Sequence, residues 1–259
     1  MSSSEKHIIP GTVSSDPWAS LKAFTPARIA LGRTGTAIPL QEVLQFRMAH
    51  AHARDAVYSL LNTDTLIAQL QSLQLPVNLL HSQAADRHEY LQRPDKGRKL
   101  DIDSINLLTS LAGSSTQQSV SIVLADGLSA TAINNNALPL LEILLPMLQQ
   151  AAIPLAPLSI VQQARVAIGD EIGSLLKAEL VVVLIGERPG LSSPDSLGVY
   201  LTYRPQPGLT DEARNCISNI RPEGLSYQAA ATKLFYLIRE SFRLRLSGVL
   251  LKDNEKLIK

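Results

Sequence analysis

Residues 180–185, Leu180-Val-Val-Val-Leu-Ile185, are the stretch of sequence that decides the fold. This apolar run is far too short to cross a membrane, and it lacks the alternation of a strand with one face in water. It lies between Glu179 and Gly186, so it has the length of a buried strand. A strand that is apolar on both faces is typical of a parallel sheet with helices on both sides.

Short apolar runs and helical patterns alternate on either side of this strand. Further strands are predicted at Ser121-Ile-Val-Leu-Ala125, Leu158–Val161 and Val199-Tyr-Leu-Thr-Tyr203, and helices at 101–112, 137–151, 172–177 and 228–246. Helices between strands imply crossover connections and parallel pairing. We therefore expect an α/β fold, with a Rossmann-like open parallel sheet and flanking helices over residues 101–259.

The chain before residue 101 has a different pattern. Between residues 39 and 62, apolar residues recur at helical spacing along one stripe, at Phe46, Ala49, Ala53, Val57 and Leu60. A second helix is predicted over 64–73. Residues 19–100 are therefore expected to form a helical N-terminal domain. Residues 1–18 show no apolar period and are expected to be a flexible tail.

Composition excludes several classes of protein. The 259 residues carry 24 Lys and Arg against 23 Asp and Glu, and the net charge of +1 argues against polynucleotide binding. The single Cys excludes an intramolecular disulfide and points to a reducing compartment. No apolar stretch approaches the roughly 20 residues of a membrane helix, and the first residues lack the apolar core of a signal peptide. We expect a soluble, cytoplasmic protein.

Two polar loops follow predicted strands, where open parallel sheets bind their ligands. Asp126-Gly127-Leu128-Ser129 follows one strand, and Gly186-Glu187-Arg188-Pro189-Gly190 follows another. In the second loop, Glu187 offers an acceptor and Arg188 a set of donors between glycines that allow close approach of a ligand. A structural turn with a surface ion pair explains that loop about equally well.

Catalytic groups are harder to find. The lone Cys216 could act as a nucleophile in a hydrolase or transferase, but no His follows residue 88 to serve as its base, so a small packed residue is the favoured interpretation. His50 and His52 are about 200° apart around a helix and do not share a metal ion. Neither a dinucleotide fingerprint nor a phosphate-binding P-loop is present. The residues alone indicate a ligand-binding or interaction domain without a complete catalytic set.

Several segments together carry a resemblance to a known family. They occur in the family's order and cover roughly residues 25–250. The chain resembles the small subunit of ethanolamine ammonia-lyase in Thr25-Pro-Ala-Arg-Ile-Ala-Leu-Gly-Arg-Thr-Gly35, Phe46-Arg-Met-Ala-His-Ala-His-Ala-Arg-Asp55, Arg93-Pro-Asp-Lys-Gly-Arg98, Ala125-Asp-Gly-Leu-Ser129, Gly186-Glu-Arg-Pro-Gly-Leu191 and Arg214-Asn-Cys-Ile-Ser-Asn-Ile220.

The resemblance implies a subunit of an adenosylcobalamin-dependent lyase that converts ethanolamine to acetaldehyde and ammonia by radical chemistry. In this family the large subunit carries the radical chemistry, and the small subunit helps to hold cobalamin at the interface between them. Carried over through the matching motifs, two small-subunit cobalamin contacts fall on Glu187 and Cys216. A third falls on Val166, which is matched through its neighbours Arg165 and Ile168-Gly-Asp-Glu-Ile-Gly173. The resemblance implies no catalytic and no metal-ligating residue in this chain. A protein-interaction module with the same fold and no cofactor is the alternative.

The resemblance also implies partners. Heterodimers with the large subunit are expected to assemble into a larger oligomer, and a basic helix edge at Arg47, Arg54 and Tyr58, with the loop 93–98, is the expected part of that interface. Family members often associate with a bacterial microcompartment through a longer amphipathic N-terminal extension. Residues 1–18 are short for such a signal and contain Pro10 and Pro17.

Overall fold

The computed structural model describes residues 13–73, 75–111 and 119–253. Its strands are β1 (Val77–His81), β2 (Val120–Ala125), β3 (Leu158–Gln162), β4 (Leu180–Gly186), β5 (Leu197–Tyr203) and β6 (Arg214–Ile220). Its α-helices are α1 (Leu40–Val57), α2 (Thr63–Ser72), α3 (Arg87–Gln92), α4 (Ile102–Leu111), α5 (Ala130–Gln150), α6 (Ile168–Leu175) and α7 (Tyr227–Leu244). Short 3-10 turns are η1 (Ala19–Phe24), η2 (Lys96–Arg98), η3 (Asp211–Ala213) and η4 (Gly248–Leu250).

The strands form one sheet in the order β1-β3-β2-β4-β5-β6. The first four in that order are parallel, so their carboxyl ends meet at one edge. β4, the strand on which the fold prediction rests, lies inside the sheet between β2 and β5 and is buried along its whole length. The predicted α/β fold with an open Rossmann-like sheet and flanking helices is confirmed.

The structure differs from the prediction at both edges of the sheet. β5 and β6 run antiparallel to their neighbours, so the sheet is mixed rather than wholly parallel. The connection over 187–196 contains no helix, and without a crossover β5 returns beside β4 in the opposite direction. β1 lies within 19–100, where only helices were expected, and it extends the sheet beyond β3. The division of the chain into domains stays a prediction, but the sheet begins before residue 101.

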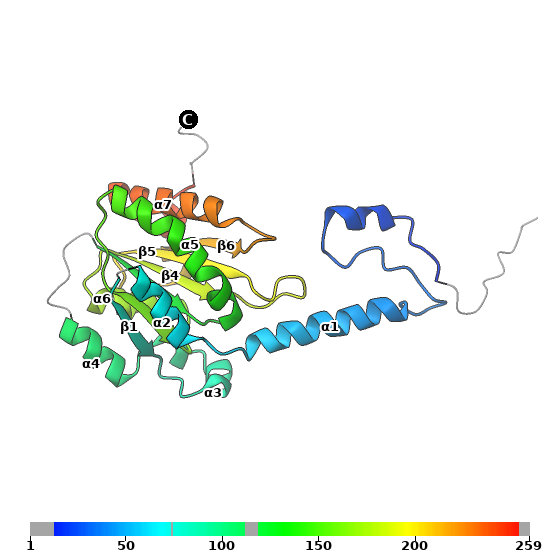
Figure 1. The fold of residues 1–259 in the computed structure, drawn as a ribbon, viewed down its shortest axis with the longest axis horizontal. Helices are drawn as coiled ribbons and strands as arrows, with labels where there is room; N and C mark the ends of the chain where they lie inside the picture. Colours follow the sequence, from blue (N-terminus) through cyan, green and yellow to red (C-terminus); the bar gives the residue numbers. More distant parts are fainter. Residues whose placement is uncertain (1–12, 74, 112–118, 254–259) are drawn as a thin grey trace, which may run out of the picture.

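The apolar core lies on both faces of the sheet. On one face, Val182 and Leu184 of β4 pack in a cluster with residues of α2, α5 and α7. On the other face, Val181, Val183 and Ile185 of the same strand pack with residues of α4 and α6. Alternate side chains of one strand therefore support both helical layers, of which Figure 1 shows α7 above the strands and α4 below them. At about 25 cal/mol per Å² of buried apolar surface, this two-sided core is the main source of stability.

Residues 13–57, which we call the arm, extend away from this α/β layer (Figure 1). Its segment before α1 folds back on the helix, because Arg28 Nη2 donates to Glu42 O at 2.8 Å and its guanidinium lies 5.0 Å from the Phe46 ring centre. Lys22 pairs with Glu42 at 3.0 Å. Residues 1–12 of the predicted tail lie outside the described residues.

The arm buries little of its own apolar surface. In α1 only Ala56 is buried among the described residues, and Phe46 of the predicted stripe remains 42% exposed. A second stripe, Leu40, Leu44 and Met48, lies away from the segment that covers Glu42 and Phe46, and these side chains are 72%, 54% and 59% exposed. The predicted helix is therefore present, but this chain does not cover its apolar side.

None of the helices in the described ranges has both the length and the apolar character needed to span a membrane.

Candidate functional site

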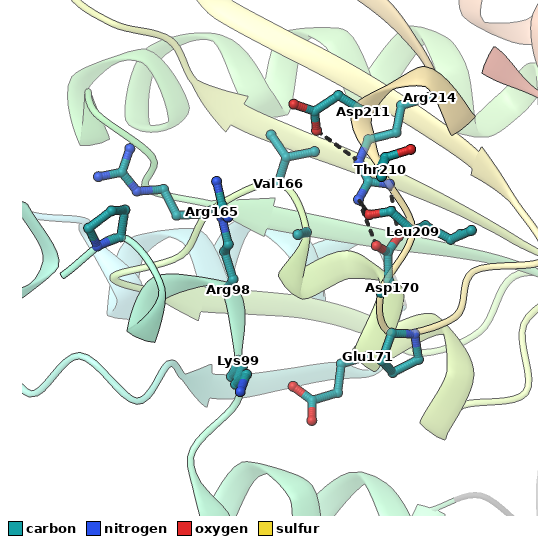
Figure 2. Close-up of a pocket in the computed structure, with 14 residues that line it drawn as sticks. Arg98, Lys99, Arg165, Val166, Asp170, Glu171, Leu209, Thr210, Asp211 and Arg214 are labelled. Atoms are coloured by element: carbon teal, nitrogen blue, oxygen red, sulfur yellow. Dashed lines mark hydrogen bonds and ion pairs between the residues drawn. The ribbon is translucent and has the colours of Figure 1, made fainter. Parts of the chain in front are cut away.

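Two clefts adjoin at the carboxyl edge of the parallel strands. The first, which we call the sheet-edge cleft, has a volume of about 450 Å³ and is lined by Tyr90, Gly127, Leu128, Arg165, Val166, Ile185, Gly186, Glu187, Arg188 and Tyr200. The second, the outer cleft, has a volume of about 800 Å³ and lies beside the turn η2 and the loop 207–211 (Figure 2). Arg165 and Val166 line both clefts.

The two loops singled out in the sequence form one side of the sheet-edge cleft. Leu128 N donates to Gly186 O at 2.9 Å, which joins the loop after β2 to the end of β4. A Cβ atom at Gly186 would lie 2.0 Å from Ser129 O, and one at Gly127, whose φ is +57°, would lie 2.2 Å from Gly186 O. Such contacts are closer than any Cβ allows, so glycine is required at both positions for the loops to meet.

Asp126 fixes the next loop against these two. Its carboxylate accepts the backbone N–H groups of Gln163 and Ala164 at 2.8 and 2.9 Å, and Arg87 lies 3.7 Å from its Oδ2. Burial raises the pKa of Asp126, while the two N–H groups and Arg87 act to lower it. The residue is 4% exposed and lies beneath the cleft, so its role is to hold the backbone before Arg165 and Val166 in place.

Two guanidinium groups stack on one buried tyrosine. Arg87 and Arg165 lie 4.7 and 4.3 Å from the Tyr90 ring centre, and the Tyr90 hydroxyl donates to Ala164 O at 3.1 Å. Burial is the main cause that raises the pKa of Tyr90, so the phenol stays neutral. Arg165 Nε is buried and has no hydrogen-bond partner among the described residues. Other parts of the Arg165 side chain line both clefts, so the residue can contact a ligand there through its accessible guanidinium atoms.

Arg87 also links the cleft to the arm. Its Nε donates to Val57 O at the end of α1 at 2.6 Å, and its Nη1 donates to Gly127 O at 2.8 Å. The residues that follow α1 are hydrogen-bonded to α5. Thr131 N donates to Ser59 Oγ at 3.0 Å, and Asn134 Nδ2 donates to Leu60 O at 3.0 Å. The base of the arm is thus attached to the layer beside the sheet-edge cleft.

Only one oxygen of the Glu187 carboxylate accepts hydrogen bonds from the described residues. Its Oε2 accepts the Ser196 hydroxyl and the backbone N–H of Asn219, the latter at 3.1 Å. No described residue donates a hydrogen bond to Oε1. Two protein donors therefore orient the carboxylate, and one oxygen remains available to a ligand with N–H groups.

Cys216 lies one strand further from the parallel part of the sheet. It pairs with Tyr200 of β5, which lines the sheet-edge cleft, but Cys216 itself does not line it. Desolvation by the surrounding protein raises the pKa of the thiol, Tyr200 acts to lower it, and Glu187 acts to raise it. The group is therefore a thiol at neutral pH, which disfavours a nucleophilic role.

A buried ion pair closes the far side of the outer cleft. Arg214 Nη2 lies 2.7 Å from Asp170 Oδ2, and both side chains are almost fully buried (Figure 2). Burial raises the pKa of Asp170 to about 6, although Arg214 acts to lower it. Within residues 13–73, 75–111 and 119–253, no group of three or more His, Cys, Asp and Glu side chains could hold a metal ion.

The structure thus brings Val166 and Glu187 to one cleft and places Cys216 beside it. Sequence reasoning missed Tyr90 and Tyr200 as parts of the site, and it used Arg165 only to align Val166. A signal was available for Arg165, because it lies four residues after the predicted strand 158–161, and loops after strands bind ligands in this fold class. Nothing in the local sequence marks Tyr90.

The fold and the clefts define the class of protein: a Rossmann-like α/β protein with clefts where the parallel strands end, the edge at which proteins of this class bind ligands. Comparison with known proteins gives the family. A family model described as "Ethanolamine ammonia-lyase light chain (EutC)" matches residues 15–252. The chain therefore belongs to the family of ethanolamine ammonia-lyase small subunits, and the resemblance seen in the sequence is confirmed.

Individual relatives agree over nearly the whole chain. The ethanolamine ammonia-lyase small subunit of Ralstonia nicotianae is 52% identical over 250 residues, 96% of this chain and 93% of that protein. That of Xanthomonas campestris pv. campestris (strain B100) is 54% identical over 247 residues, 94% of this chain and 90% of that protein. That of Pseudomonas aeruginosa (strain LESB58) is 53% identical over 250 residues, 96% of this chain and 91% of that protein.

Proposed function

We propose that the sheet-edge cleft holds the corrin of adenosylcobalamin, with Val166, Glu187 and Cys216 on the side that this chain contributes. As a small subunit of this family, the chain is part of an adenosylcobalamin-dependent carbon–nitrogen lyase and has a large subunit as its partner. The alternative of an interaction module without a cofactor is set aside, since the family depends on the cofactor. The observation that carries the proposal is the Glu187 carboxylate, which lines a cleft at the carboxyl edge of the sheet and has one oxygen that accepts no hydrogen bond from a described residue.

The chemistry of the cleft fits the rim of a corrin. The rim carries neutral amide side chains, which donate N–H and accept at C=O. Glu187 Oε1 can accept a hydrogen bond from the amide N–H groups, and the guanidinium of Arg165, which lines the cleft, can donate to the amide C=O groups. The half-buried Val166 adds apolar surface between these two groups. Cys216 contributes packing or backbone contacts through its position beside Tyr200.

The residues of this chain position and shield the cofactor. Adenosylcobalamin, when bound, supplies a carbon radical that removes a hydrogen atom from the substrate. Glu187 and Arg165 orient the macrocycle, and burial of the cleft between two subunits excludes water that would quench reactive species. As the family resemblance implies, the conversion of ethanolamine to acetaldehyde and ammonia takes place mainly on the large subunit.

The arm is the part of the chain that fits the large subunit. Its open stripe of Leu40, Leu44 and Met48 has no cover in this chain, and Arg47 and Arg54 lie beside it on α1. The surface suits an apolar partner face with acidic groups at its rim. The heterodimers then assemble into a larger oligomer in the cytoplasm, with a link to a bacterial microcompartment through the ethanolamine pathway.

The proposal is tested by cobalamin binding to the assembled enzyme. We expect Glu187→Ala to weaken binding by about tenfold, since it removes a charged hydrogen-bond acceptor, and Glu187→Gln to recover part of the loss. Binding is measured by equilibrium dialysis and by the visible spectrum of the bound cofactor. Glu142→Ala, at an exposed position of α5, is the matched control. Unchanged cofactor affinity in the folded Glu187→Ala enzyme would remove Glu187 from the site.

A further inference from the structure

The hydrogen bonds that orient Glu187 come from two separate segments of the chain. One donor to its Oε2 is the hydroxyl of Ser196, at the end of the loop between β4 and β5. The other donor is the backbone N–H of Asn219, near the end of β6, at 3.1 Å. The direction of the Glu187 carboxylate therefore depends on how these two segments are held relative to each other.

Arg221, the first residue after β6, contacts both segments. Its Nε donates to Asn219 Oδ1 at 3.1 Å. Its Nη1 lies 3.6 Å from Oδ1 of Asp195, the residue that precedes Ser196. The Arg221 side chain is only 10% exposed, so water screens this ion pair less than it screens a surface pair. One guanidinium thus joins the two segments that supply the donors to Glu187.

The backbone on each side of this link is fixed as well. Asn219 has a φ of +58°, a left-handed conformation that asparagine adopts more readily than most residues. Its carbonyl oxygen accepts Leu225 N at 2.7 Å, so the turn after β6 closes on it. In the other segment, Asp195 O accepts Asn136 Nδ2 of α5 at 2.8 Å. Arg221 therefore connects two backbone segments that each have an anchor of their own.

The Glu187 side chain also packs closely on the sheet. A Cβ atom at Gly198 of β5 would lie 3.0 Å from Glu187 Cγ and 3.1 Å from its Oε1. The side chain is therefore confined by the backbone of β5 while its Oε2 is held by two donors. A carboxylate that is fixed before a ligand binds loses less conformational entropy on binding than a mobile one.

We propose that Arg221 is a positioning residue for the cofactor. By joining Asp195 to Asn219, it holds both donors of Glu187 and so orients the carboxylate at the sheet-edge cleft. Arg221 is not among the residues that line this cleft, so it acts through Glu187 and not by contact with the corrin. This inference rests on the proposed corrin site in the sheet-edge cleft.

The test is a double-mutant cycle on the complex of this chain with its large subunit. In Arg221→Gln we expect the dissociation constant of adenosylcobalamin to rise by about fivefold, since the acceptor at Glu187 is no longer held in place. In a Glu187→Ala background, the same substitution should cause no further loss, because the group through which it acts is absent. Equilibrium dialysis with visible spectroscopy measures all four dissociation constants, independently of turnover.

Milder variants and a matched control separate positioning from folding. Asn219→Gly keeps the left-handed backbone and its N–H but removes the acceptor of Arg221 Nε, so it should weaken cofactor binding by about two- to threefold, again only when Glu187 is present. It also serves as the test if Arg221→Gln does not fold. The control is Glu223→Gln, because Glu223 pairs with the same guanidinium at 3.7 Å but is exposed and gives Glu187 no donor. It should leave the dissociation constant unchanged.

The outcomes distinguish this inference from the proposed site on which it rests. If Arg221→Gln and Asn219→Gly weaken binding equally with and without Glu187, Arg221 acts on the fold and the positioning role is overturned. If Glu187→Ala weakens binding but neither Arg221→Gln nor Asn219→Gly does, the corrin site stands and only the positioning role fails. If Glu187→Ala alone leaves the affinity unchanged, the corrin site fails and the positioning role with it.

Discussion

The α/β layer and the arm use similar apolar residues in opposite ways. In the layer, β4 buries every side chain between helices on both faces. In the arm, an α-helix of 18 residues buries only Ala56 among the described residues and leaves Leu40, Leu44 and Met48 open. Isolated helices of that length are marginal in water unless tertiary contacts cover an apolar face.

The difference teaches where each region obtains its stability. The layer is stabilised by surface that this chain buries against itself. The arm is held at its base by Arg87 and along α1 by Arg28 and Lys22, which are polar contacts of modest net value. We therefore infer that the layer depends on its own sequence and the arm on the large subunit, and the following predictions test that contrast.

The largest effect is expected for truncation in the core. Leu184→Ala on β4, a fully buried position, should lower the free energy of unfolding by about 2–5 kcal/mol. Leu44→Ala makes the same change on α1, where the side chain is 54% exposed, and should change it by less than about 0.5 kcal/mol. Urea unfolding of the purified full chain measures both. Equal losses would erase the contrast between the two regions.

Replacing a glycine with alanine should give a smaller difference in stability loss between the layer and the arm than the leucine truncations do. Gly186→Ala places a Cβ 2.0 Å from a backbone oxygen, so we expect a loss of about 1–3 kcal/mol and a weakened sheet-edge cleft. Gly35→Ala in the arm meets nothing within 4 Å and has a φ of +60°. It should cost about 1 kcal/mol or less, from backbone conformation alone. Thermal unfolding gives the order, and a larger loss for Gly35→Ala would contradict it.

Leu44→Asp should act on assembly rather than on folding. A carboxylate in the open stripe of α1 would have to be desolvated against the large subunit, so we expect about tenfold weaker association. Gln45→Asp introduces the same charge one residue away, off the stripe, and should have a smaller effect. Association is measured by titration of the two purified subunits. If both variants associate like the wild type, the stripe is not the interface.

The smallest expected effect is the pH dependence of stability that comes from Asp170, a carboxyl group buried in the layer. A carboxyl titration followed by NMR should give Asp170 a pKa of about 6, above its usual 3.8. Because the folded-state pKa is raised, the stabilising contribution of this group is complete below about pH 4 and is lost as pH rises through 6. Asp170→Asn should remove that pH dependence. A midpoint below 3.8 would show that attraction to Arg214 outweighs burial.

The parallel core of the fold could be predicted because its signals are local. β4 is a continuous apolar run, and β2 is interrupted only by Ser121. The ends of α4 were predicted to within one residue, whereas α1 ends at Val57, five residues before the predicted end. β6 was missed because its buried positions, Arg214, Ile217 and Ile220, are three residues apart, so the alternation of period two is absent. β1 was missed because it is a short edge strand with only Leu80 buried.

The site could be predicted only in part, for the same physical reason. The loops at Gly127 and Gly186 follow strands, so their meeting at one edge follows from parallel topology. The positions of Val166, Glu187 and Cys216 come from family resemblance. The stacking of Tyr90 between Arg87 and Arg165 depends on α3 folding over the sheet edge, and no local pattern encodes such a distant contact.

Arg87 has a consequence for the accuracy of assembly. One guanidinium binds both the last carbonyl of α1 and the backbone of Gly127 in the sheet-edge cleft. The same side chain therefore holds both the end of the arm and the backbone of the cleft in place. Since a misplacement of about 1 Å can cost on the order of 100-fold in rate, a large subunit that binds the arm as proposed would be aligned with the proposed cofactor cleft as it docks.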